Sequence, residues 1–322
     1  MANRAAAGNG LMEITDFLFS FCGEKKPDNG EDSFVYALNE KRALVGVFDG
    51  CGGSGASQYA AAKGKTGAYL ASRATSAAWM EWFELLEDGR EPDPEELKSL
   101  ILRNLKLCEA NAGEDSGSKL LGRMSKKLPT TAAAALCRPG RGYVDVLLHW
   151  AGDSRVYLLD AKGLAQLTED DLGGIDAMRN LSEDGVLTNV ISLTRNFDIH
   201  SARLSLSGPT LLFASTDGCF GYLSTPMEFE YLLLQTLQNA SSPEEWEKAL
   251  FKRIGDIAGD DYTISGISLY AGSFDNLKRQ LAARSSQVYR DYIRGLDSCS
   301  REEKLQLWEH YKDNYHRLLS RV

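Results

Sequence analysis

A short turn between two β-rich runs constrains the fold of this chain more than any other feature. The runs Ser33–Leu38 and Ala43–Phe48 flank the polar residues 39–42, which predicts an antiparallel hairpin. Asp32 and Asp49 are mirror positions about this turn, so they should face each other at the open end of the hairpin. Like charges directly opposite destabilise a sheet unless a positive group lies between them. The hairpin therefore predicts a cation beside these two carboxylates.

The same pattern, an acid at the end of an apolar strand, recurs along the chain. Asp217 follows the apolar run 210–215, Asp260 precedes the run 262–270, and Asp153 lies in a tight turn. Any one of them can be explained as an ordinary turn residue, since Asp-Gly is a common turn dipeptide. As a group, an all-oxygen cluster suits Mg²⁺ or Mn²⁺ rather than zinc. Two such ions bridged by a carboxylate can activate water and clamp a phosphoryl group.

The rest of the chain reads as alternating strands and helices. Helix-capping patterns at Asp93, Thr225 and Ser242, each followed by proline, predict three helix starts. An Ala-rich stretch predicts a further helix over 55–86, and the helix after Asp93 should run to about residue 112. We expect strands over 131–137, 143–150, 156–159, 210–215 and 262–270. The polar stretch 169–207 is too long for a plain connection, which indicates a flap or small subdomain.

Residues 272–322 have a different pattern from the body of the chain. Apolar residues recur there at helical spacing in two stripes, Leu277, Leu281, Val288, Tyr292 and Leu296, and then Leu305, Trp308, Tyr311, Tyr315 and Leu318. A capping box at Ser300 and Glu303 begins the second helix. The stripes favour a helical pair packed on the body, and the alternative is a dimer or partner contact through these helices.

Composition excludes several classes of protein. The chain has 45 acidic and 36 basic residues in 322, for a net charge of −9, which argues against nucleic acid as the main partner. No run approaches the ~18 apolar residues that would span a bilayer, and the first residues lack the apolar stretch of a secretory signal. The six cysteines are scattered and contain no C-x-x-C pair. We expect a soluble cytoplasmic protein that binds neither nucleic acid nor membrane.

The order and wording of several short motifs resemble one known family. The motifs are Glu31-Asp32, VFDGCGG at 47–53, Thr130-Thr131, AGDSRVY at 151–157, QLTED at 166–170, LLFASTDG at 211–218 and DDYT at 260–263. In combination they resemble the metal-dependent Ser/Thr protein phosphatases of type 2C (PPM), over about residues 20–271. The resemblance implies an α+β fold, a four-layer α-β-β-α sandwich of two antiparallel sheets flanked by helices. It divides the chain into a phosphatase domain, 1–271, and a C-terminal helical extension, 272–322.

The resemblance also implies roles for individual acids. Asp49 matches the carboxylate that bridges two metal ions, and Gly50 matches a ligand through its backbone carbonyl. Asp217 and Asp260 match the remaining ligands of the first ion.

For the second ion, the resemblance implies Glu31 or Asp32 as a ligand, direct or through water, without choosing between them. Asp153 matches an acid that holds a third, weaker ion in part of the family. The implied cofactors are two or three Mn²⁺ or Mg²⁺ ions. The implied reaction is direct attack of metal-bound water on phosphoserine or phosphothreonine of a phosphoprotein substrate.

Two positions depart from the family pattern. Cys51 replaces a histidine proposed to protonate the leaving group, and a thiol is a poorer proton source at neutral pH. Lys25 or Lys26 stands where an arginine often holds the substrate phosphate, so a point charge replaces a bidentate fork. Cys51 can also be interpreted as a redox switch, although a small residue tolerated in the loop is the favoured interpretation.

Three functions fit these observations. The leading hypothesis is an active protein phosphatase, because the acids are retained. The first alternative is a phosphatase-shaped binding module with little turnover, for which the changes at Cys51 and the lysines argue. The second is a metallo-phosphohydrolase of small phosphate esters. A nucleophilic-aspartate phosphatase is disfavoured, because Asp49 is followed by Gly-Cys rather than by the x-Asp that such an enzyme needs.

Overall fold

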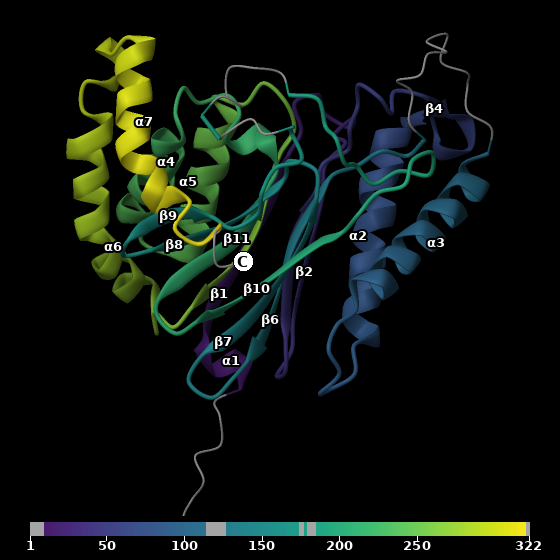
Figure 1. Cartoon of the computed structure of the whole chain (residues 1–322), viewed down its shortest axis with the longest axis horizontal. Coiled ribbons are helices and arrows are strands. Elements are labelled where there is room, and N and C mark those ends of the chain that lie inside the picture. Colours follow the sequence, from purple (N-terminus) through teal and green to yellow (C-terminus); the bar gives the residue numbers. More distant parts are fainter. Residues whose placement is uncertain (1–9, 114–126, 174–176, 179–184, 320–322) are drawn as a thin grey trace, which may run out of the picture.

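The computed structural model describes residues 10–113, 127–173, 177–178 and 185–319, and it contains two facing antiparallel sheets with helices on both outer faces (Figure 1). Sheet one consists, in spatial order, of β1 (Thr15–Gly23), β12 (Tyr262–Leu269), β11 (Thr210–Ser215), β8 (Arg155–Asp160) and β9 (Gly163–Gln166). Sheet two consists of β10 (His200–Leu206), β7 (Val144–Ala151), β6 (Ala132–Pro139), β3 (Ala43–Phe48) and β2 (Ser33–Leu38).

Helices cover the outer face of each sheet. Sheet two is covered by α2 (Gly67–Leu85) and α3 (Pro94–Ala112). Sheet one is covered by α4 (Pro226–Asn239), α5 (Pro243–Gly255), α6 (Phe274–Val288) and α7 (Arg301–Tyr315). Figure 1 shows the two groups of helices on opposite sides of the sandwich. The predicted α+β sandwich of two antiparallel sheets flanked by helices is confirmed.

Three apolar layers hold the sandwich together: one between the sheets and one under each group of helices. The central strands β3 and β12 are buried at every position, because each contributes one face to the inter-sheet layer and the other to a helix layer. Such strands read as continuous apolar runs rather than as alternating ones. This burial explains why these two strands were recognisable from the sequence.

The predicted helix caps are present. The side chains of Asp93, Thr225 and Ser242 accept hydrogen bonds from backbone amides in the first turns of α3, α4 and α5. Each cap satisfies an amide that has no partner within its own helix. In α7 both bonds of the capping box between Ser300 and Glu303 are formed.

The helix expected over 55–86 is wrong at its start. α2 begins at Gly67, with the Thr66 side chain as its cap. The preceding residues form β4 (Gln58–Tyr59), the single turn η1 (Ala60–Ala62) and β5 (Lys65–Thr66). Lys63 and Gly64 have φ values of 57° and 78°, a left-handed conformation that interrupts a right-handed helix. The alanine content of this segment therefore misled the prediction.

The stretch 169–207 is only partly separate from the sandwich. Its last residues form β10, which pairs with β7 at the edge of sheet two, so the expected flap is wrong there. Residues 174–176 and 179–184 of this stretch lie outside the described residues. The strands β1 and β9 were not predicted, although Phe17, Phe19 and Phe21 alternate along β1 and face the helix layer on sheet one.

The C-terminal helices pack on the body through the predicted stripes. Trp308, Tyr311 and Tyr315 of α7 are each 1% exposed and belong to the layer outside sheet one. Leu305, also in the predicted stripe, is 40% exposed. The apolar face of α7 is therefore largely used within the chain, and a dimer contact through these helices stays a prediction. No described helix has the length and apolar character needed to cross a bilayer.

Candidate functional site

The acids predicted at strand ends lie at one end of the sandwich. In the hairpin of β2 and β3, Ser33 pairs with Phe48, so the predicted register is confirmed and Asp32 and Asp49 follow one position beyond the last pair. The Thr216 hydroxyl, at the end of β11, donates a 2.8 Å hydrogen bond to Asp32 Oδ2. This bond joins the end of sheet one to the end of sheet two.

Sheet one carries its acids to the same end. Ser215 of β11 pairs with Arg155 at the start of β8 and with Ile264 near the start of β12. Asp217 therefore follows β11 at the edge where Asp153 precedes β8 and Asp260 precedes β12. The antiparallel order of the strands thus brings together acids that are far apart in the sequence, with 228 positions between Asp32 and Asp260.

Backbone contacts fix the segment that carries Asp49. Its carbonyl oxygen accepts hydrogen bonds from Thr130 Oγ1 at 2.7 Å and from the Thr131 amide at 2.8 Å. A Cβ at Gly50 would lie 2.7 Å from the carbonyl oxygens of Ala68 and Glu31, so no other residue fits there without a backbone shift. The loop after β3 is therefore held closely between β6, α2 and the segment before β2.

The carboxylates raise one another's pKa values. Burial, and then repulsion from Asp32, Asp217, Asp153 and Asp260, raises the pKa of Asp49 well above its usual range. Burial first and neighbouring acids next raise the pKa of Asp32 and that of Asp153 to about 8 each, and the pKa of Asp217 rises for the same reasons. Removal from water and mutual repulsion both penalise the ionised form. The local electrostatics therefore favour binding of positive charge.

The donor chemistry fits a divalent cation. Carboxylate oxygens, with the backbone carbonyl of Gly50, are the hard ligands that Mg²⁺ and Mn²⁺ take. Gly218 is packed so closely that a Cβ would lie 1.8 Å from the Asp261 carbonyl oxygen, which keeps the Asp217 turn against the start of β12. Within the described ranges, no three His, Cys, Asp or Glu side chains converge closely enough to hold a metal ion. The ligand set Glu31, Asp32, Asp49, Gly50, Asp153, Asp217 and Asp260 stays a prediction.

Glu31 and Asp32 have different surroundings. The Asp32 side chain is 2% exposed and is oriented by Thr216. Glu31 is half-buried, accepts a hydrogen bond from the Thr66 hydroxyl, and has its pKa raised mainly by burial. Its backbone amide donates to Asp261 Oδ2 at 2.7 Å. Asp32 is therefore held inside the sandwich, whereas Glu31 lies nearer the surface, in contact with α2.

The residues expected at the substrate and leaving-group positions are placed near this end. The Lys25 ammonium donates to the Ala258 carbonyl at 2.7 Å, and the Lys25 amide donates to Asp261. Lys26 is exposed. Cys51 is half-buried, with its amide bonded to the Pro129 carbonyl. None of the six cysteines, all of which lie in the described ranges, forms a disulfide. Neither the phosphate role of the lysines nor a redox role of Cys51 is tested by these contacts.

Several residues that hold the acids in place were not predicted from the sequence. Asp261 accepts from the Lys25 and Glu31 amides and so joins the start of β12 to the segment before β2. Asp171 accepts from the Gly152 amide at 2.8 Å and contacts His200 Nε2 at 2.9 Å, which ties the Asp153 turn to β10. The only sign of them in the sequence was a pair of adjacent acids at 170–171 and another at 260–261. Such a pair does not tell which acid would bind a metal ion and which would hold the other in place.

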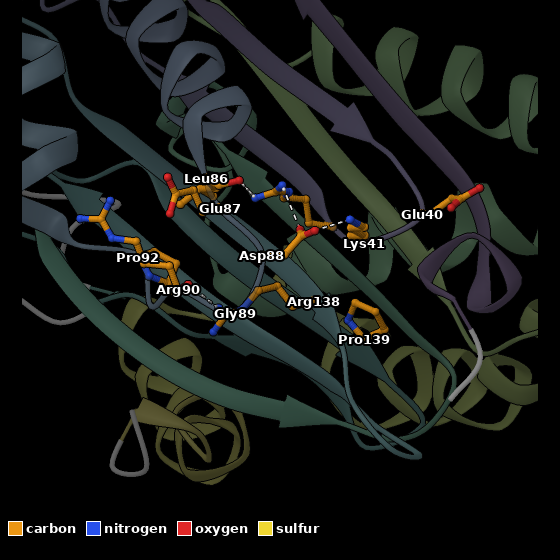
Figure 2. Close-up of a pocket in the computed structure, with 11 residues that line it drawn as sticks. Glu40, Lys41, Leu86, Glu87, Asp88, Gly89, Arg90, Pro92, Arg138 and Pro139 are labelled. Atoms are coloured by element: carbon orange, nitrogen blue, oxygen red, sulfur yellow. Dashed lines mark hydrogen bonds and ion pairs between the residues drawn. The ribbon is translucent and has the colours of Figure 1, made fainter. Parts of the chain in front are cut away.

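A cavity of about 340 Å³ lies at the opposite end of the hairpin, around its turn (Figure 2). A six-residue strand is about 20 Å long, so this cavity is separated from Asp49 by the length of β3. Figure 2 shows Asp88 facing Lys41, with which it forms an ion pair, and Asp88 also pairs with Arg42. Asp88 is therefore neutralised by neighbouring cations. In contrast, Asp32, Asp49, Asp153 and Asp217, which form the acidic end of the sandwich, raise one another's pKa values.

Known proteins resemble this chain in structure, although no match is found by sequence. No family model matches the chain, and no curated protein sequence matches it. A bacterial serine phosphatase superposes with a TM-score of 0.57 at 18% identity, over 78% of this chain and 97% of that one. Serine/threonine phosphatase Stp1 from Staphylococcus aureus superposes with a TM-score of 0.53 at 18% identity, over 84% and 99% of the chains.

A third solved structure carries the family name. The PPM Ser-Thr phosphatase MsPP from Mycobacterium smegmatis, in complex with cacodylate, superposes with a TM-score of 0.53 at 14% identity, over 80% of this chain and 99% of that one. The alignments thus span nearly the whole of each neighbour. The chain has the fold of the type 2C (PPM) Ser/Thr protein phosphatases.

Proposed function

We propose that the chain is a metal-dependent protein phosphatase that hydrolyses phosphoserine or phosphothreonine. The observation that carries the proposal is the group of mutually repelling carboxylates, Asp32, Asp49, Asp153 and Asp217, at one end of a sandwich with the type 2C fold. Repulsion of this kind costs stability unless bound cations offset it. In the proposal, two or three Mn²⁺ or Mg²⁺ ions occupy this end.

The proposed ligands are Asp49 as the bridging carboxylate, the Gly50 carbonyl, Asp217 and Asp260 for the first ion, Glu31 or Asp32 for the second, and Asp153 for a third. Bound there, divalent cations would lower the pKa of a coordinated water and neutralise the phosphoryl oxygens. The bonds from Thr130 and Thr131 to the Asp49 carbonyl hold that residue in place. Thr216 orients Asp32 in the same way. The substrate is proposed to be a phosphoprotein.

Hydrolysis assays test this proposal directly. We expect turnover of phosphothreonine peptides and of p-nitrophenyl phosphate with Mn²⁺, and none with chelator. If the chain binds metal but hydrolyses no phosphate ester, the proposed phosphatase activity is contradicted. The alternative of a phosphatase-shaped binding module then remains. Turnover of nucleotides or sugar phosphates, with phosphopeptides untouched, would contradict the proposed substrate class. Asp217→Asn, which preserves shape and removes charge, is the matched variant for the metal requirement.

A further inference from the structure

The last helix of the chain contacts the residues that support the acidic end. Arg155 is 1% exposed and lies two positions after Asp153. Its Nη1 donates to the Tyr157 hydroxyl at 3.0 Å and to the Tyr315 hydroxyl of α7 at 3.4 Å, and Tyr315 donates to Tyr157 at 3.2 Å. A residue of the C-terminal extension thus accepts a hydrogen bond from a buried guanidinium 160 positions away.

Arg155 is also joined to the two turns that carry proposed ligands. Its Nε and Nη2 donate to both oxygens of Asp170, with Nη2 to Oδ2 at 2.6 Å. Asp170 precedes Asp171, whose side chain and amide both bond to Gly152 at the start of the Asp153 turn. This is one route from the guanidinium to Asp153.

The second route runs through an aromatic ring. The guanidinium carbon of Arg155 lies 4.1 Å from the centre of the Phe220 ring. Phe220 belongs to the turn of Asp217, since its amide donates to the Asp217 carbonyl at 3.0 Å. A shift of Arg155 would therefore disturb the backbone next to Asp217 as well as the turn of Asp153.

α7 is fixed to the body independently of this contact. The Tyr311 hydroxyl donates to buried Glu230 of α4, which also pairs with Arg284 of α6. Beyond the end of α7, Arg317 donates to Asp160 at 2.9 Å and to the Gly163 carbonyl at 2.8 Å, on the turn between β8 and β9. Tyr315 is thus presented to Arg155 by a helix anchored on both sides.

We propose that α7 is a structural part of the acidic end, and that Tyr315 is a positioning residue that acts through Arg155 on the turns of Asp153 and Asp217. The inference rests on the proposed function in so far as those acids hold metal ions. The C-terminal extension then stabilises the metal-binding end of its own chain, and displacing α7 would weaken metal binding.

Calorimetric titration of the full chain with Mn²⁺ tests this role. Tyr315→Phe keeps the ring and removes the hydroxyl, and losing a bond to a charged group should weaken Mn²⁺ binding about threefold to tenfold. Tyr311→Phe is the matched control: it removes an equally buried hydroxyl of the same helix that bonds Glu230 instead. Because Arg317 and the apolar face of α7 still hold the helix in place in this variant, we expect it to lower the melting temperature and leave Mn²⁺ affinity within twofold of wild type.

A double-mutant cycle of Tyr315→Phe with Arg155→Lys adds a second readout. If Tyr315 acts through Arg155, the combined loss of Mn²⁺ affinity will be smaller than the product of the single losses. Unchanged affinity in Tyr315→Phe, equal weakening in Tyr311→Phe, or a wild type that binds no Mn²⁺ would each overturn the inference. If Mn²⁺ binding depends on Tyr315 but the protein hydrolyses no phosphate ester, the inference holds and the proposed phosphatase activity is overturned.

Discussion

The pKa values of carboxylates are shifted in opposite directions at the two ends of the β2–β3 hairpin. At the closed end, Asp88 bonds Lys41 and Asp145 bonds Arg138 and Arg203, and these bonds hold the pKa values of both acids below their usual range. At the open end the pKa values of Asp32 and Asp49 are raised by burial and by like charge.

The difference lies in the partners rather than in the number of acids. In the part of the chain that the structure describes, no Lys or Arg lies within ion-pair distance of Asp49, Asp153 or Asp217. Arg155 lies nearby and offsets part of the rise in the pKa values of Asp153 and Asp217, but it hydrogen-bonds to Asp170 and two tyrosine hydroxyls rather than to these acids. Acids paired with protein cations stabilise a fold, whereas clustered acids without them are typical of sites that bind external cations.

The largest expected effect comes from removing one charge at the open end. Asp49→Asn should lower metal-dependent hydrolysis by roughly a thousandfold or more, because the proposed role of Asp49 is to hold both ions, and bound ions contribute several kcal/mol of transition-state stabilisation. Steady-state rates at saturating Mn²⁺ measure it. Activity within tenfold of wild type would remove Asp49 from the proposed centre.

The two ends should also respond oppositely to pH. Since Asp32 has a pKa of about 8 in the folded chain against an ordinary 3.8, the folded state retains a proton that the unfolded state has released between these values. The metal-free protein should therefore lose stability as pH rises from 4 to 8, and Mn²⁺ should reverse that loss. Melting temperatures across this range, with chelator and with Mn²⁺, test the sign. If the metal-free protein instead gained stability up to pH 8, the raised pKa values of the clustered acids would be contradicted.

Close packing at the open end gives a test that does not alter charge. Gly218→Ala would force a Cβ against the Asp261 carbonyl, so we expect a loss of about 2–3 kcal/mol in the free energy of unfolding and weaker Mn²⁺ binding. Gly208→Ala is the control, because a Cβ there meets no atom within 4 Å. Denaturant unfolding compares the two variants. Equal stability in both would show that the Asp217 turn tolerates displacement.

The smallest effect is expected at the closed end. Asp145→Asn removes the acceptor shared by Arg138 and Arg203 and should cost about 1 kcal/mol, as partly exposed ion pairs do. Its contribution is lost as pH falls through the lowered pKa of Asp145, so the variant and wild type should converge in stability at low pH. Hydrolysis should stay within twofold of wild type. A larger fall in activity would mean that the ends are not independent.

Much of the fold was predictable because its signals are local. The register of the hairpin, with Ser33 opposite Phe48, follows from the turn between the strands. The caps at Asp93, Thr225 and Ser242 depend on residues within one helical turn. Where local signals conflicted, as in the Ala-rich segment before Gly67, the prediction was wrong.

The sequence by itself determined where the acids stand on their strands and which residues begin the helices, because backbone geometry relates neighbours a few positions apart. Only the tertiary structure decided what those acids face. Thr216 reaches Asp32 across 184 positions, and Tyr315 reaches Arg155 across 160. Such contacts depend on how two sheets and an added helix pack together, and packing is set by the whole apolar core rather than by any short motif.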